Sequence, residues 1–126
     1  EIAEDLIRQF GEDGITNPVE HYGLLNVETT ADRIIAVVEY LHRHPRFKFN
    51  FLTDLVGIHF PDAKGKELGV IYHLHSWENN VRIMVKVFVP IENPVLPAMV
   101  NVFACANWME REAYDFFGFH FEGHPN

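Results

Sequence analysis

The sequence predicts an α+β fold, a two-layer sandwich in which helices pack on one face of a mainly antiparallel sheet. Three observations lead to this fold class. Residues 81–90 alternate between apolar side chains and others, the period of a strand with one buried face. Residues 67–77 precede them across Glu78-Asn79-Asn80, so the two segments form a hairpin. Helical apolar spacing occurs on both sides of the hairpin, over 31–44 and 107–117.

The first part of the chain supplies two helices and a strand. Residues 1–11 and 31–44 carry apolar side chains at helical spacing, and 22–27 have the composition of a strand. His42 and His44 fall in the last turn of the second helix, at the negative end of its dipole. We expect both histidines to be exposed there and to bind no ligand.

Residues 49–60 follow no single period. We predict a short turn around Thr53-Asp54 and then a strand through Ile58, followed by another turn over 61–66. Residues 90–97 contain three prolines and predict an extended connection, and 98–104 predict a short helix.

The helix over 107–117 has markers at both ends. Asn107 has the side chain of an N-cap residue, and Glu110 falls three residues later, where a capping box places its acid. Gly118 follows the last helical residue, where a left-handed cap needs no Cβ.

The faces of this helix allow two interpretations. Arg111 and Asp115 are close enough to pair at i, i+4, and a solvated amphipathic helix with such pairs is common. Three charges in a row beside Trp108 and Tyr114 favour instead a protein interface, where tryptophan, tyrosine and arginine are enriched. The apolar stripe comprises Met109, Ala113, Phe116 and Phe117.

Composition indicates one globular domain over residues 1–126, because 48% of the residues are hydrophobic and 13% aromatic. The net charge of −8 argues against a nucleic-acid partner, which a basic patch would bind. The single cysteine, Cys105, excludes an internal disulfide and a cysteine-ligated iron–sulfur cluster. Its apolar neighbours over 102–106 predict a buried thiol rather than a nucleophile.

No apolar run approaches the roughly 20 residues of a membrane helix, and no signal segment opens the chain. At a membrane, such a protein would be a peripheral partner. The chain begins without methionine and stops at Asn126, so we expect a piece of a longer protein.

Two groups of histidines raise the question of a metal. His73 and His75 lie two apart on one predicted strand and point the same way, as half of a zinc site would, and His59 on the neighbouring strand is the available third ligand. Histidines on a solvated sheet face are far commoner. His120 and His124 lie in a glycine-flanked loop, for which we expect a structural role.

Patterns of a catalytic site are missing from the sequence. No glycine-rich dinucleotide loop and no Walker-type loop is present. Glu112 and Asp115 lie close enough on the predicted helix for their side chains to contact each other. Nothing in the sequence indicates the desolvation that would raise the pKa of either group, as a general acid requires. The sequence therefore predicts neither an active site nor a cofactor in this chain.

Glu110-Arg111-Glu112, followed by Asp115, two apolar residues and Gly118, and then Gly123-His124-Pro125, resembles the signature of the thirty-kilodalton subunit of respiratory complex I. In bacteria this is the C subunit of the proton-pumping NADH:quinone oxidoreductase. The resemblance begins at about Glu28, and the C-terminal signature is its most specific part. In the family the signature continues into a basic and aliphatic run, which lies past the end of this sequence.

The resemblance implies a non-catalytic subunit of the peripheral arm, on the cytoplasmic side of the bacterial inner membrane. Such a subunit packs against the large subunit of the forty-nine-kilodalton type, here called the large quinone-module subunit, and helps to assemble the quinone module. Flavin, iron–sulfur clusters and quinone belong to partner subunits in this family. The residues expected at the interface, or in the fold that supports it, are Trp108, Glu110, Arg111, Glu112, Tyr114, Asp115, Gly118 and His124.

Two alternatives stay open. A related domain occurs in membrane-bound energy-converting hydrogenases, and genomic neighbours or the C-terminal extension would distinguish it. The second is a small metalloenzyme that uses His59, His73 and His75, for which bound zinc would be the sign.

Overall fold

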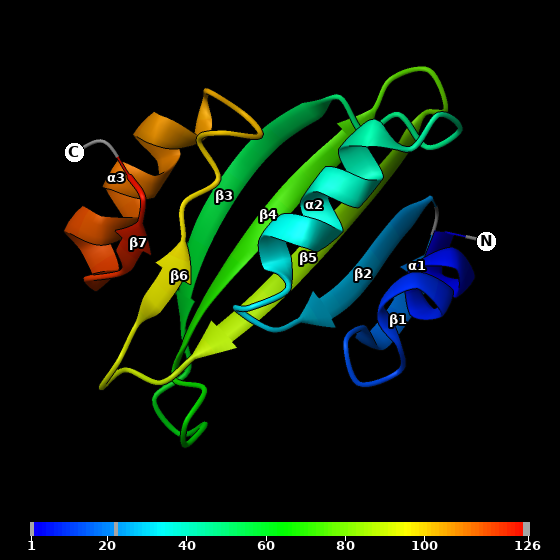
Figure 1. The fold of residues 1–126 in the computed structure, drawn as a ribbon. Helices are drawn as coiled ribbons and strands as arrows, with labels where there is room; N and C mark the ends of the chain where they lie inside the picture. Colours follow the sequence, from blue (N-terminus) through cyan, green and yellow to red (C-terminus); the bar gives the residue numbers. More distant parts are fainter. Residues whose placement is uncertain (1, 22, 125–126) are drawn as a thin grey trace.

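A computed structural model describes residues 2–21 and 23–124 (Figure 1). One layer is a five-stranded sheet of order β1-β2-β5-β4-β3. β2 and β5 are parallel, and the other neighbouring strands are antiparallel, which confirms the predicted fold class. The strands are β1 (Thr16–His21), β2 (Leu24–Thr29), β3 (Phe51–His59), β4 (Leu68–Ser76) and β5 (Val81–Val89).

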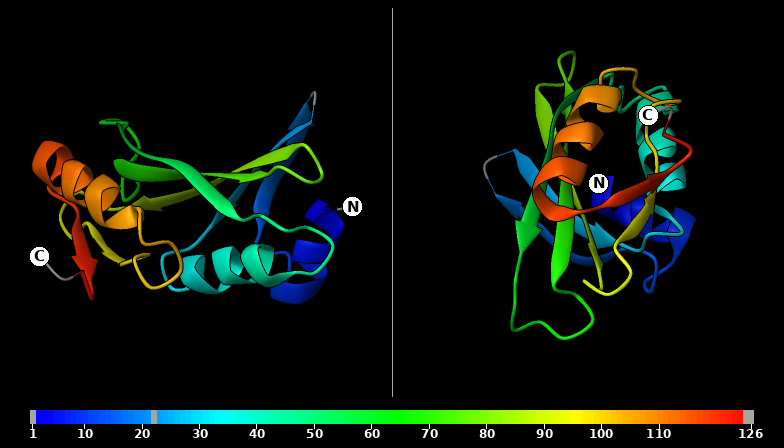
Figure 2. Two further views of the ribbon diagram at one scale, coloured as in Figure 1. Left: turned by 90° about the horizontal axis from the view of Figure 1, so that it is seen from above. Right: turned by 90° about the vertical axis from the view of Figure 1, so that its left-hand side faces the viewer.

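Two helices form the second layer. α1 (Ile2–Phe10) and α2 (Ile34–Arg43) lie on the same side of the sheet (Figure 2). α2 turns four apolar residues into the core at helical spacing, with Val37 buried where Ile35 was predicted. β5 contributes alternate valines and Ile83. The buried residues of α2 are Ile34, Val37, Val38 and Leu41.

The C-terminal part adds a helix and a small second sheet. α3 (Ala106–Phe117) lies beside the edge strand β3, far from α1 (Figure 1). β6 (Val95–Pro97) and β7 (His120–Glu122) pair in parallel beside it. In the part of the chain that the structure describes, no helix is long and apolar enough to cross a membrane.

The structure corrects the predicted elements in several places. β1, β6 and β7 were missed; β1 contains Pro18, which an edge strand tolerates because one side of it needs no ladder donor. The short helix predicted over 98–104 is wrong. That segment forms turns, in which the N–H groups of Val102 and Phe103 both donate to Met99 O.

The turn predicted around Thr53-Asp54 is also wrong, because β3 runs through it. The β3–β4 register shifts between Leu52 and Asp54, which marks a β-bulge. The extra residue keeps Leu52 and Leu55 both on the buried face, three positions apart. The bulge therefore accounts for the broken alternation in the sequence.

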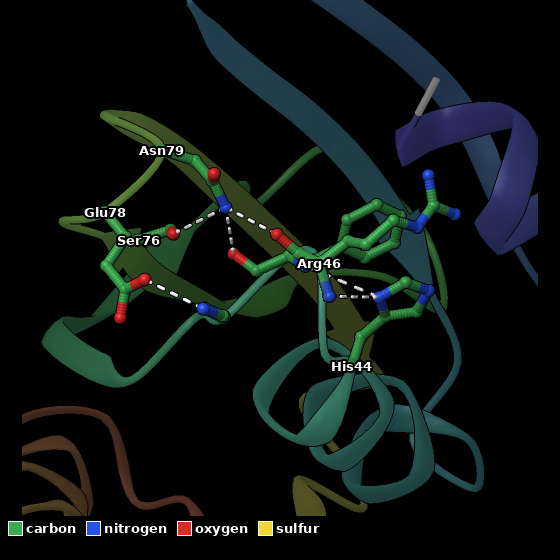
Figure 3. A network of polar contacts seen from close by, with 7 residues as sticks. His44, Arg46, Ser76, Glu78 and Asn79 are labelled. Carbon is green, nitrogen blue, oxygen red and sulfur yellow. Dashed lines mark hydrogen bonds and ion pairs between the residues drawn. The ribbon is translucent and has the colours of Figure 1, made fainter.

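A polar network joins the β4–β5 turn to the segment after α2 (Figure 3). Asn79 Nδ2 lies 2.6 Å from Arg46 O, 2.9 Å from Phe47 O and 3.2 Å from Ser76 Oγ. Lys48 and Glu78 form an ion pair of 2.8 Å in the same region. The side-chain amide of Asn79 thus joins the turn of the β4–β5 hairpin to the segment that follows α2.

Replacing Asn79 by alanine is expected to lower the free energy of unfolding by about 1–2 kcal/mol, because backbone carbonyls lose their donor. Asn80→Gly is the matched control, since glycine tolerates the positive φ of 53° at that position and leaves the network intact. Urea unfolding followed by circular dichroism measures both. An equal effect of the two substitutions would contradict the role assigned to Asn79.

Candidate functional site

α3 is the predicted signature helix, and the structure confirms its C-terminal cap. Gly118 has φ 78° and its N–H donates to Tyr114 O. The predicted N-cap, Asn107, is wrong. The N-cap position is Cys105, two residues earlier, and its side chain makes no capping hydrogen bond. The reason is that the turns preceding α3 already run into the helix, with Asn107 N–H donating to Ala104 O.

The buried side of α3 differs from the predicted stripe. Ala106, Glu110 and Ala113 are buried, whereas Phe116 is 81% exposed. Phe117 packs on the sheet instead, over Gly57 of β3, where an added Cβ would lie 2.6 Å from its ring. A rotation of the helix by about one residue relative to the prediction therefore places a carboxyl group in the interior.

Glu110 is completely buried and does not form the predicted capping box. Its Oε2 accepts the N–H of Met99 at 2.6 Å, so it joins α3 to the turns that precede it. Burial raises the pKa of Glu110 to about 7, against the opposing effects of the Met99 N–H and of His124. Near neutral pH the group is therefore a mixture of carboxylate and carboxylic acid.

The second carboxyl oxygen, Glu110 Oε1, has no hydrogen-bond partner among the described residues. His124 Nε2 lies 3.9 Å from it. The same nitrogen lies 3.0 Å from Asn107 O, so it carries a hydrogen and donates it to that carbonyl. The buried hydroxyl of Tyr72 also lacks a described partner, and burial together with the Glu110 charge raises its pKa.

A cavity of about 280 Å³, here called the α3 cavity, opens beside Glu110. Glu110, Phe119 and Phe121 are buried and form its inner part, whereas Tyr114 and His120 are exposed and lie nearer solvent. The cavity therefore combines a buried acid with aromatic walls. Its lining residues are Glu110, Arg111, Tyr114, Phe119, His120, Phe121 and His124.

The solvent side of α3 exposes large aromatic side chains together with charges, and two of its residues, Arg111 and Tyr114, also border the α3 cavity. Trp108 is 63% exposed and Tyr114 58%. Arg111 and Asp115 are both exposed, and no ion pair joins them in the described part of the chain. We call this surface the α3 outer face; it comprises Trp108, Arg111, Glu112, Tyr114, Asp115 and Phe116.

The three histidines considered as metal ligands do not converge. His73 and His75 lie on β4, with His73 opposite Asp54 of β3. His59 lies at the far end of the same ladder, opposite Leu68. Within residues 2–21 and 23–124, no group of three histidine, cysteine, aspartate or glutamate residues could hold a metal ion.

Three other predicted environments are wrong. Cys105 is exposed, because it lies in the turn that leads into α3. His42 and His44 are half-buried, because the chain after α2 folds back over the last turn of the helix. His42 Nδ1 lies 3.0 Å from Phe49 O, and the His44 ring stacks on Phe47 at 3.8 Å between centroids. Both histidines have structural contacts.

Residues 27–126 match the family described as "Respiratory-chain NADH dehydrogenase, 30 Kd subunit". The C subunit of NADH-quinone oxidoreductase from Mycolicibacterium gilvum is 36% identical over 130 residues, covering 100% of this chain and 58% of the relative. The protein of the same name from Nocardioides sp. is 36% identical, with 99% and 52% covered. That from Caulobacter sp. is 39% identical, with 83% and 48% covered. The chain thus spans about half the length of the curated relatives that it matches.

Two solved structures share the fold. The trypsin-resistant fragment of Nqo5 is 32% identical, with a TM-score of 0.78, and 100% of this chain and 99% of that chain are covered. A chain of the membrane-bound sulfane sulfur reductase, an archaeal respiratory membrane complex, has a TM-score of 0.82 at 22% identity, with 98% and 69% covered; this likeness shows the fold alone. The chain therefore belongs to the family of the 30 Kd subunit of the respiratory-chain NADH dehydrogenase.

Proposed function

We propose that this chain is part of the C subunit of a proton-translocating NADH-quinone oxidoreductase and that its α3 outer face binds the large quinone-module subunit. The α3 outer face carries the proposal. Phe116 is 81% exposed and Trp108 is 63% exposed, on the helix that holds the family signature. Exposed aromatic side chains that cluster with charges are typical of a surface that another protein covers.

The buried side of α3 gives this surface a fixed shape. Glu110 holds Met99 at one end of the helix, and His124 holds Asn107 from the C-terminal loop. Gly118 lets the chain turn back at the other end, so that β7 returns beside β6. A preorganised surface loses less conformational entropy on binding than a mobile one. The buried signature residues therefore support the exposed ones.

In this proposal the chain is an assembly subunit without an active site of its own. Flavin, iron–sulfur clusters and quinone belong to partner subunits, and one cysteine supplies too few thiolates for a cluster. The subunit lies on the cytoplasmic side of the bacterial inner membrane as a peripheral component, where it helps to hold the quinone module together.

Trp108→Asp in the full-length protein is expected to lower recovery of the large quinone-module subunit by about tenfold or more, because it places a charge at an aromatic anchor. The protein is affinity-purified from its own membranes, and the partners are identified by mass spectrometry. Trp77→Asp is the matched control: Trp77 is 68% exposed but lies at the end of the β4–β5 hairpin.

Equal recovery with Trp108→Asp and Trp77→Asp would contradict binding through the α3 outer face. Charge reversal of both Arg111 and Asp115 tests the polar part of the same surface, and unchanged assembly would count against it. Recovery of hydrogenase subunits in place of the large quinone-module subunit would assign the chain to an energy-converting hydrogenase.

A further inference from the structure

His124 lies between two hydrogen-bond acceptors of α3, one of which can gain and lose a proton. Its Nε2 lies 3.0 Å from Asn107 O and 3.9 Å from Glu110 Oε1. We propose that these three groups form a pH-dependent switch. The His124 N–H binds Asn107 O while Glu110 is a carboxylic acid, and it turns toward Glu110 Oε1 once Glu110 is a carboxylate. The switch changes how the C-terminal loop is held on α3, and it does not depend on the proposed function.

The hydrogen bond from Met99 decides which oxygen of Glu110 changes. Oε2 accepts the Met99 N–H at 2.6 Å. The carbonyl-type oxygen of a carboxylic acid is its better acceptor, so the acid form carries its proton on Oε1. Loss of that proton turns Oε1 from a donor into a charged acceptor. Because charged acceptors form stronger hydrogen bonds than neutral carbonyls, ionisation makes Oε1 a better acceptor than Asn107 O.

Solvent does not reach Glu110 Oε1, so the carboxylate depends on the protein for a donor. Glu110 is completely buried, and the His124 side chain is 10% exposed. At 3.9 Å, His124 Nε2 and Glu110 Oε1 leave no room for a water molecule between them. A buried carboxylate without a donor is much less favourable than a buried carboxylic acid. His124 supplies the donor by moving its Nε2 by about 1 Å, to an ordinary hydrogen-bond distance.

Gly123 gives His124 the freedom for this movement. It has φ 87°, and the space where a Cβ would lie is open. The His124 N–H closes the turn by donating to Phe121 O at 3.2 Å. The pairing of β6 with β7 ends at Glu122, opposite Pro97. The loop can therefore reorient the His124 ring while the small sheet stays paired.

The other titratable and charged groups around Glu110 come from β4, α3 and β7. Tyr72 of β4 is neutral, because burial and the Glu110 charge raise the pKa of its hydroxyl. Arg111 and His120 line the α3 cavity, and both are exposed, so water screens their charges. Burial raises the pKa of Glu110 to about 7, against the opposing effects of the Met99 N–H and of His124. The exchange therefore takes place near neutral pH.

The first measurement follows NMR signals of the full-length wild-type protein, labelled with carbon-13 and nitrogen-15, from pH 5 to 9. The Glu110 carboxyl carbon reports ionisation, and the Asn107 carbonyl carbon reports its hydrogen bond with His124. We expect both signals to change with one midpoint, at about pH 7. An Asn107 carbonyl signal that stays constant while Glu110 ionises overturns the switch, and this test needs no substitution.

Three variants identify the group that drives the change. Glu110→Gln keeps an acceptor for Met99 but cannot ionise, so we expect the Asn107 carbonyl to lose its step near pH 7. Glu112→Gln removes an exposed charge from the same helix, and the step is expected to persist with an unchanged midpoint. Tyr72→Phe removes the other buried hydroxyl near Glu110, and the step is expected to persist there as well.

Two outcomes in the variants overturn the switch. A step that survives in Glu110→Gln would assign the change to protonation of the His124 ring itself. A step that disappears in Tyr72→Phe would make Tyr72, rather than His124, the donor to the ionised carboxyl group.

Discussion

Phe119→Ala is expected to lower the free energy of unfolding by about 3–5 kcal/mol, the largest effect of any single substitution considered for α3 and its surroundings. Phe119 is fully buried, and its ring centroid lies 6.1 Å from that of Phe117 and 6.0 Å from that of Phe121. It also reaches Gly57 of β3, where an added Cβ would lie 3.3 Å from the ring. Truncation leaves a cavity between α3, β7 and the sheet. Urea unfolding followed by circular dichroism measures the loss.

Phe116→Ala provides the control for this prediction. Phe116 is the same residue type three positions earlier and is 81% exposed, so its truncation is expected to change stability by less than about 0.5 kcal/mol. A loss of comparable size in both variants would mean that the buried side of α3 includes Phe116.

Glu110→Gln is expected to stabilise the protein by about 3 kcal/mol at pH 8 and by less than about 1 kcal/mol at pH 5. The pKa of Glu110 is raised from 4.5 in the unfolded chain to about 7 in the folded protein, chiefly by burial. The folded state therefore binds the proton more tightly, so the contribution of Glu110 to stability falls between pH 4.5 and about 7, where the unfolded chain is ionised and the folded protein is not, and levels off above that range. The Glu110 contribution to wild-type stability falls as the pH rises from 5 to 8, and glutamine removes this contribution while it keeps the acceptor for Met99.

The measurement is urea unfolding of wild type and variant at pH 5, 6, 7 and 8. The difference between the two free energies of unfolding is taken at each pH, so that the contributions of other titrating groups cancel. Glu112→Gln is the control, because Glu112 is exposed on the same helix. If the free energy of unfolding of the wild type minus that of Glu110→Gln stays constant with pH, the result would contradict titration of a buried carboxyl group at position 110.

The elements predicted correctly are those whose local pattern agrees with their place in the core. β5 alternates because one face is buried, and α2 has helical spacing because one side packs on the sheet. β1, β6 and β7 carry no such pattern. β1 is an edge strand with Pro18 in it, and β6 and β7 have three residues each. Their pairing depends on neighbours that local sequence does not reveal.

At the candidate site, the sequence indicated the right helix but placed Phe116 on its buried stripe and Glu110 among its outward charges, and both assignments are wrong. Phe116 and Phe117 are adjacent and both apolar, so spacing alone does not decide which one enters the core. Gly57 decides it, because only a residue without a Cβ leaves space for the Phe117 ring. The burial of Glu110 follows from the same rotation. Its acceptor role toward Met99 depends on turns that the sequence predicted as a helix.

The parallel pairing of β2 with β5 has a consequence for the order in which the protein acquires structure during synthesis. Val27 pairs with Val85, so β2 has no sheet to join until β5 has left the ribosome. Until then β1 and β2 form at most a two-stranded hairpin, which is marginal in water. The closing of this long loop carries an entropic cost that local contacts do not offset. A nascent chain halted before β5 therefore exposes an unpaired edge of β2, and this edge is where a chaperone or a wrong strand would bind first.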